Sequence, residues 1–250
     1  MFSLITTTLG SVGLFALAVQ IVASAIQYFF NNMMRVELAN LPNSSDPAAG
    51  LAIFKSIWYW GTMASSTLLG SLEISGSMHG MIKKAWGQTT SFADCVTFGL
   101  SRLVPALAVY ILWFLGVGFA SMLLFIPGMI LMTMWSAAMP ALVGEETGVT
   151  ESFGRSRALT RGSRWQIFFT IVIVLVVIYG VFFGAMAAIF GGGIEKFGAA
   201  MNASPWMILV SIPTGWIFAS LLNALLASIY VEMVSIKEGA PRDQLSGVFN

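Results

Sequence analysis

The chain has 250 residues, of which 57% are hydrophobic and only 9% are charged. Soluble domains carry about 25% charged residues, so a soluble globular fold is excluded and an integral membrane protein remains. The net charge of +1 provides no basic surface for nucleic acid, the single Cys95 excludes an intramolecular disulfide, and the single His79 argues against a His-rich metal site. We therefore expect no nucleic-acid partner, no metal and no other cofactor.

Long uncharged runs divide the chain into about six predicted transmembrane helices. A helix needs ~20 mainly apolar residues to cross the hydrocarbon core of a bilayer. The expected fold is an all-α, polytopic membrane helix bundle with short amphipathic cytoplasmic helices, forming a single domain over residues 1–250. The predicted spans cover residues 10–30, 54–75, 103–126, 129–144, 165–190 and 205–231.

The first two predicted spans contain Gln and Glu side chains, and polar groups inside a membrane are candidate functional sites. Gln20 and Gln27 lie seven residues apart on one face of the first span, which favours hydrogen bonds between helices. Glu73 lies toward the cytoplasmic end of the second span. It is expected to pair with Lys83 or Lys84, and a role as a proton relay or an ion ligand is the alternative.

The uncharged run over residues 103–144 is too long for one span, so we predict a hairpin of two helices. Pro127 and Gly128 interrupt this run, because Pro lacks a backbone donor and Gly relaxes the turn. The second helix of the hairpin, residues 129–144, is short, and a re-entrant segment is the alternative to a full crossing. Its methionines favour packing over a soft-metal site, since the chain contains 15 Met.

The segment between the fourth and fifth spans predicts a short, basic, amphipathic helix. Thr150 is the expected N-cap, and Arg161 followed by Gly162 marks the end. Such a helix suits the headgroup layer, where each basic residue gains roughly 1 kcal/mol near anionic lipid. The alternative is that its arginines only set the topology. The candidate contacts with lipid or with a partner are Phe153, Arg155, Arg157, Leu159, Arg161 and Arg164.

The last two predicted spans contain a small-residue ridge and a central amide. Gly180, Gly184 and Ala188 recur every four residues in the fifth span, which allows close contact between helices. Packing within the chain and oligomerisation are both consistent with this ridge. Asn223 lies near the centre of the sixth span, where it is expected to hydrogen-bond to another helix, and Pro213 is a candidate kink.

The distribution of basic residues predicts the orientation, because positively charged loops resist translocation. With the N-terminus inside, three basic residues fall outside, namely Arg35, Lys55 and Lys196. We therefore predict that both termini are cytoplasmic. The cytoplasmic segments would hold Lys83, Lys84, Arg102, Arg155, Arg157, Arg161, Arg164, Lys237 and Arg242.

A set of short matches in the second half of the chain points to a known family. The matching residues are Ile126–Gly128, Pro140–Val143, Glu145, Gly148, Glu151–Ser152, Arg155–Arg157, Leu159–Gly162, Tyr230 and Lys237–Gly239. This pattern resembles the membrane domain of bacterial glycerophosphoryl diester phosphodiesterases and its stand-alone relatives. The resemblance covers most of residues 90–240, whereas the first 90 residues match in hydropathy only.

The resemblance implies a six-helix bundle in the bacterial inner membrane, sometimes joined to a soluble catalytic domain. A phosphodiesterase of that type needs catalytic His and acidic metal ligands. One His in a loop cannot supply them, so the resemblance does not predict hydrolysis here.

The sequence therefore predicts a non-enzymatic protein of the bacterial inner membrane that contacts membrane lipids, anionic ones in particular. It would serve as a scaffold or as an accessory subunit, with a membrane-protein partner or a second copy of itself. The alternative is a transporter or channel for a small solute, with Pro127, Pro213, Glu73 and Asn223 shaping its pathway. A third hypothesis, an intramembrane enzyme, requires polar side chains that converge in a pocket.

Overall fold

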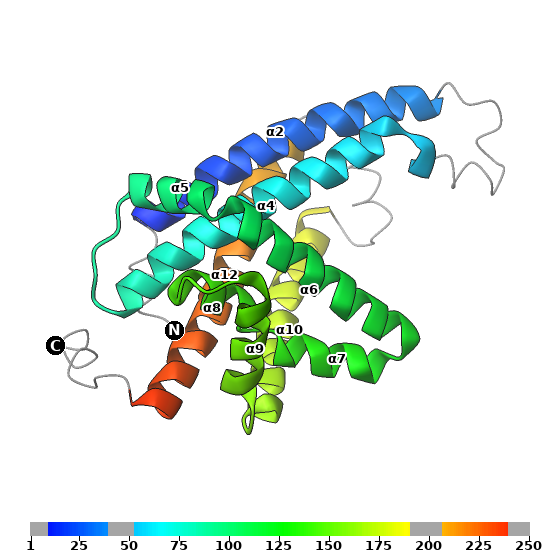
Figure 1. The fold of residues 1–250 in the computed structure, drawn as a ribbon. Coiled ribbons are helices and arrows are strands. Elements are labelled where there is room, and N and C mark those ends of the chain that lie inside the picture. The colour runs from blue at the N-terminus through cyan, green and yellow to red at the C-terminus, as the bar shows by residue number, and fades with distance from the viewer. Residues whose placement is uncertain (1–9, 40–52, 191–206, 240–250) are drawn as a thin grey trace.

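The structure is a computed structural model and describes residues 10–39, 53–190 and 207–239. Every regular element within these ranges is a helix (Figure 1). The elements are α2 (Ser11–Ala39), the 3₁₀ turn η1 (Ile53–Lys55), α4 (Ile57–Ala85), α5 (Phe92–Ser101), α6 (Leu103–Leu123), α7 (Phe125–Met134), α8 (Ala138–Gly144), α9 (Val149–Thr160), α10 (Arg164–Phe190) and α12 (Met207–Glu238). The expected all-α class is confirmed.

Five helical segments are long and apolar enough to cross a membrane, which indicates a multi-pass membrane protein. One predicted span is missing from this set, namely the second, which corresponds to α4. Helix α4 has 29 residues, but Ser, Thr and Gly interrupt its apolar sequence. The qualifying segments are Ser11–Ala39, Leu103–Leu123, Ile126–Gly144, Arg164–Gly184 and Leu209–Glu238.

Helix α4 is less apolar because it is the central helix and packs against protein. It lies beside α2 along its length and also contacts α5, α6, α8 and α12 (Figure 1). Its glycines allow this close packing: a Cβ on Gly76 would lie 2.6 Å from the carbonyl oxygen of Cys95, and one on Gly80 would lie 2.4 Å from the Val12 side chain. Helices α6 and α10 differ, since only 11% of each qualifying segment is buried. Their apolar side chains therefore suit contact with lipid.

The core lies where α2, α4, α8, α9 and α12 meet. Each of these helices contributes a large and fully buried side chain. The indole nitrogen of Trp216 also donates a hydrogen bond to the Gly13 carbonyl oxygen at 2.9 Å, which joins α12 to α2. The five buried core side chains are Phe15, Met78, Leu142, Leu159 and Leu225.

The predicted hairpin is present as α6 and α7, but its turn lies earlier than expected. Leu124 has an extended backbone between the two helices, whereas Pro127 lies in the first turn of α7, where a missing backbone donor costs little. Gly128 serves the packing of the hairpin and not its turn. A Cβ at this position would lie 1.9 Å from the Ser121 hydroxyl.

The fourth predicted span consists of two helices, α7 and α8, separated by a break at residues 135–137. Helix α9 satisfies the backbone groups at this break. The Ser156 hydroxyl donates to the Met134 carbonyl oxygen at 2.8 Å and accepts from the Ala137 N–H at 3.1 Å. Thr160 adds a longer hydrogen bond to the same carbonyl oxygen, at 3.4 Å. The break is therefore stabilised by a helix that comes later in the chain.

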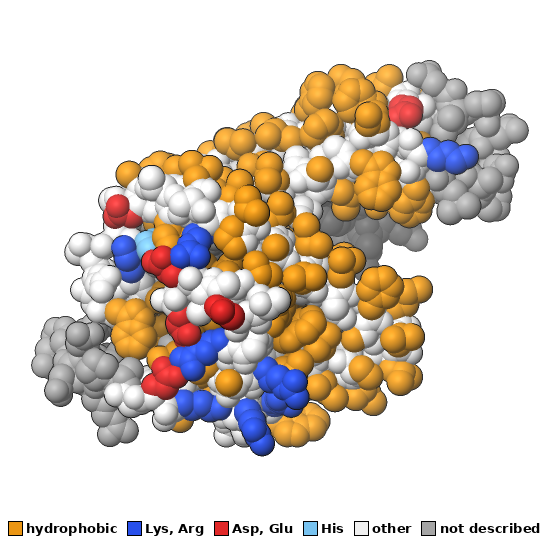
Figure 2. Space-filling model, viewed as in Figure 1, with side chains coloured by type: hydrophobic (Ala, Val, Ile, Leu, Met, Phe, Trp, Pro, Cys, Tyr) orange, Lys and Arg blue, Asp and Glu red, His pale blue; other side chains and the backbone are white. Residues whose placement is uncertain are grey.

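Charged side chains gather toward the two ends of the visible face, and most of them lie at one end (Figure 2). That end is formed by the last turns of α4 and α12, by α5 and by α9 (Figure 1). Apolar side chains dominate the surface between the two ends. The candidate site residues on α9 belong to the charge-rich end.

Candidate functional site

Helix α9 begins and ends close to the predicted positions. The N-cap is Gly148 and not the expected Thr150, because the Glu151 carboxylate accepts the Gly148 N–H at 3.0 Å. The helix ends at Thr160, and Gly162 follows with a φ of +93°, a conformation that favours glycine.

The inner face of α9 packs against protein, and its place in the headgroup layer stays a prediction. Leu159 is 1% exposed and belongs to the core, so it contacts no lipid. Phe153 is half-buried against Trp135, with ring centroids 4.7 Å apart. Ser152 and Ser156 are fully buried on the same side. The sequence does not indicate the roles of these two buried serines, because Ser is also common on exposed helix faces.

Arg155 is held between two carboxylates of the protein. Its Nε lies 2.7 Å and 2.8 Å from the two oxygens of Glu145, and its Nη2 lies 2.5 Å from Glu238. Tyr230 donates to Glu145 at 3.0 Å. Burial alone would lower the pKa of Arg155, but the two carboxylates raise it above its usual value. The guanidinium is therefore charged and locally neutralised.

Two further basic side chains are also occupied at this end of the molecule. Lys237 donates to the carbonyl oxygens of Ala158 at 2.7 Å and Arg161 at 2.8 Å, where the last carbonyl groups of α9 need partners. Arg102 forms an ion pair with Glu146 at 2.6 Å. These contacts, with those of Arg155, fix the loop between α8 and α9 and join it to α6 and α12.

The remaining arginines of the segment form a surface with unpaired positive charge, which we call the junction surface and define as Arg157, Arg161, Arg164 and Trp165. Arg157 and Arg161 are exposed, and neither side chain has an ion-pair partner in the part of the chain that the structure describes. Arg164 is half-buried, and its buried Nε has no hydrogen-bond partner among the described residues. Trp165 is 74% exposed.

The two candidate polar groups inside the membrane contact each other. Asn223 Nδ2 of α12 donates to Glu73 Oε1 of α4 at 3.5 Å. The expected partner of Glu73 was Lys83 or Lys84, so the pairing through α12 is a finding of the structure. Asn223 is buried, as its central position in the sixth span predicts. Gln20 donates to Ser24 in its own helix at 3.4 Å.

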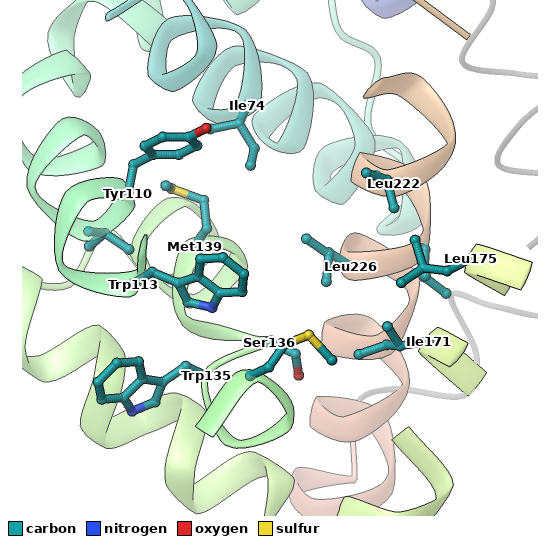
Figure 3. Close-up of a pocket in the computed structure, with 13 residues that line it drawn as sticks. Ile74, Tyr110, Trp113, Trp135, Ser136, Met139, Ile171, Leu175, Leu222 and Leu226 are labelled. Carbon is teal, nitrogen blue, oxygen red and sulfur yellow. The ribbon is translucent and has the colours of Figure 1, made fainter. Parts of the chain in front are cut away.

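An apolar cavity of about 240 Å³ lies between the helices (Figure 3). Tyr110 and Trp113 of α6 face Leu222 and Leu226 of α12 across it. Ile74 also lines the cavity, but its neighbour Glu73 is not among the lining residues. The wall is almost entirely aliphatic and aromatic, so it suits a hydrocarbon chain better than an ion.

The small-residue ridge of α10 does not pack against another described helix. Gly180 and Gly184 are exposed, and a Cβ on either would have nothing within 4 Å. Among the described residues, these two glycines therefore do not contact another helix, and oligomerisation is the alternative that remains for them. The side chain of Ala188 and residue Lys196 lie outside the described part, as does Arg242.

The remaining titratable side chains of the described ranges include one His and one Cys, and neither belongs to a metal-binding group there. No group of three or more His, Cys, Asp or Glu side chains is placed to hold a metal ion there. His79 stacks on Phe98, with ring centroids 3.7 Å apart. Cys95 is fully buried on α5, and burial raises the pKa of its thiol to about 11.

Comparison with known proteins identifies no family. No family model, no curated protein and no solved structure matches the chain. The resemblance to the membrane domain of glycerophosphoryl diester phosphodiesterases stays a prediction.

Proposed function

We propose that the protein is a non-enzymatic component of the bacterial inner membrane that contacts anionic lipid through the junction surface. It acts as a scaffold or as an accessory subunit of a membrane complex, with both termini cytoplasmic. The observation that carries the proposal is that some basic residues are paired within the protein and others are not. Arg155, Arg102 and Lys237 are occupied by contacts within the protein, whereas the arginines of the junction surface are available to an external anion.

The surroundings of these arginines support the same function. Trp165 is exposed beside them, and tryptophan side chains are enriched at the level of lipid headgroups. A Lys or Arg near a surface of anionic lipid gains roughly 1 kcal/mol. Two such arginines, Arg157 and Arg161, would therefore favour anionic over zwitterionic lipid by about 2 kcal/mol, or roughly 30-fold.

The test compares the lipids around the protein in nanodiscs made from phosphatidylglycerol and phosphatidylcholine. The double variant Arg157→Gln/Arg161→Gln should lose most of its enrichment of phosphatidylglycerol. Arg157→Lys/Arg161→Lys keeps the charge and should keep the enrichment, and Lys55→Gln removes a charge at the opposite end. An unchanged enrichment in the Gln variant would overturn the proposal.

A transporter is the second candidate, supported by the hydrogen bond between Glu73 and Asn223 inside the bundle. The hydroxyls of Ser77 and Ser220 are buried near this pair in the sequence and have no partner among the described residues. Proteoliposomes with an internal pH-sensitive dye test this function. Proton flux that disappears in Glu73→Gln would favour transport over a scaffold, and an absence of flux in the unmodified protein would exclude a proton pathway.

A further inference from the structure

A second and larger hollow lies on the surface between α7 and α10, beside the junction surface. It has a volume of about 440 Å³, within the range of ligand pockets. Ile126, Met129 and Ile130 line it from one face of α7, and Phe168 lines it from α10. Ile126 is 69% exposed and Ile130 is 53% exposed, so this groove opens outward toward the surrounding lipid.

The polar groups of the groove lie together at one end. Thr133 belongs to the last turn of α7, and Arg164 is the first residue of α10. Thr160 precedes Arg164 by four residues and bonds to the carbonyl oxygen of Met134, which follows Thr133. Helix α9 therefore brings the end of α7 close to the start of α10. The groove is charged at this end, and its remaining lining is apolar.

Arg164 lacks an acceptor at the charged end. Arg164 lines the groove, and its buried Nε has no hydrogen-bond partner among the described residues. A buried charged donor without an acceptor costs folding free energy, so an anion bound at this position would stabilise the protein. The start of α10 adds backbone N–H groups that have no partner within the helix, together with the positive end of the helix dipole. A phosphate group is the kind of anion that guanidinium groups and helix N-termini bind.

We propose that the groove between α7 and α10 binds one anionic phospholipid, with its phosphate on Arg164 and one acyl chain along α7. This site rests on the proposed function and gives it a specific location. Arg157 and Arg161 are exposed and have no ion-pair partner among the described residues, and they favour an anionic headgroup over a zwitterionic one. Trp165 lines the groove and is exposed, which fits a position at the headgroup level.

The experiment counts the phosphatidylglycerol molecules that stay on the purified protein during stepwise removal of lipid, by native mass spectrometry. The unmodified protein should retain one molecule after the others are lost. Arg164→Gln should lower its retention at least 10-fold, and Arg164→Lys should restore part of it. Ile126→Trp fills the groove and should also remove the retained molecule.

Ile173→Trp is the matched control, since Ile173 is 60% exposed on α10 and does not line the groove. It should retain the lipid as the unmodified protein does. Equal retention in Ile126→Trp and Ile173→Trp would overturn the groove as the site. Equal retention of phosphatidylcholine would overturn the preference for an anionic lipid.

These outcomes are separable from those of the proposed function. One outcome is loss of the single retained lipid in Arg164→Gln with unchanged enrichment in Arg157→Gln/Arg161→Gln. It would support the lipid site in the groove and reject the contact of Arg157 and Arg161 with anionic lipid. Unchanged retention in Arg164→Gln with lost enrichment in Arg157→Gln/Arg161→Gln would reject the lipid site in the groove and support the contact of Arg157 and Arg161 with anionic lipid.

Discussion

Arg155 and Arg157 are two residues apart on α9 and have different roles. Arg155 bonds to Glu145 and Glu238, whereas Arg157 is exposed and has no ion pair within the described residues. The sequence grouped them as equivalent basic residues, because the partners of Arg155 lie in a loop 10 residues earlier and at the end of α12. No local pattern in the chain reveals that pairing.

Replacement of Arg155 should therefore destabilise the fold. Arg155→Ala leaves two carboxylates without their partner and should lower the free energy of unfolding by about 1.5–3 kcal/mol. Arg157→Ala removes an exposed charge and should change it by less than about 0.5 kcal/mol. Thermal unfolding in detergent measures both. Equal melting temperatures for the two variants would contradict the ion-pair network.

At the scale of the elements, the sequence predicts apolar runs well and their interruptions poorly. The fifth predicted span agrees closely with α10, whereas α12 continues to Glu238, beyond the predicted end of the sixth span at residue 231. The turn of the hairpin lies at Leu124 and not at Pro127, since a proline is tolerated in the first turn of a helix. The break between α7 and α8 has no Gly or Pro at residues 135–137, so the local sequence does not indicate it. The hydrogen bonds from Ser156 are visible only in the structure.

The break between α7 and α8 should depend on Ser156. Ser156→Ala leaves the Ala137 N–H without its acceptor and should lower the stability by about 1–3 kcal/mol. Ser152→Ala is the control, because Ser152 is equally buried but bonds to Val149 within its own helix. Hydrogen exchange should also accelerate at the amide of Ala137 in Ser156→Ala alone. Protection of that amide in the variant would show that α9 does not support the break.

The α6–α7 hairpin should depend on the small size of Gly128. In Gly128→Ala the new Cβ would overlap Ser121, which should destabilise the protein by about 1–3 kcal/mol. Gly118→Ala on α6 meets nothing within 4 Å and should be neutral or stabilising by up to about 1 kcal/mol. Melting temperatures of the two variants test this contrast. A melting temperature for Gly128→Ala at or above that of Gly118→Ala would contradict the packing.

At the scale of the whole molecule, the sequence predicts the class and the approximate spans, and tertiary contacts decide the arrangement. Charge scarcity identifies a membrane protein, and the apolar runs locate α2, α6, α10 and α12. The central position of α4 could not be predicted, because the sequence indicates residues 54–75 only as one more span and not which helices pack around it. The pair of Glu73 and Asn223 could not be predicted either, since 150 positions separate the two residues.

The whole bundle should loosen when this pair is broken. Asn223→Ala removes the described hydrogen-bond partner of Glu73 and should lower the stability by about 1–2 kcal/mol, the range of interhelical hydrogen bonds in membranes. Ser228→Ala is the control on α12, because Ser228 bonds only to Ala224 in its own helix. Unfolding in a denaturing detergent compares them. Equal stabilities of Asn223→Ala and Ser228→Ala would contradict a stabilising role for the hydrogen bond between Asn223 and Glu73.

The position of α4 also constrains how the protein is made. Glu73 lies on a helix that is not among the five segments long and apolar enough to cross a membrane, and its partner Asn223 follows 150 residues later. At a synthesis rate of about 5–20 residues per second, the carboxyl group waits roughly 8–30 s for that partner. During this interval α2, already synthesised and packed along α4, is the neighbour that can shield it. During synthesis, α2 and α4 must therefore accommodate the Glu73 carboxyl group until α12 brings in Asn223.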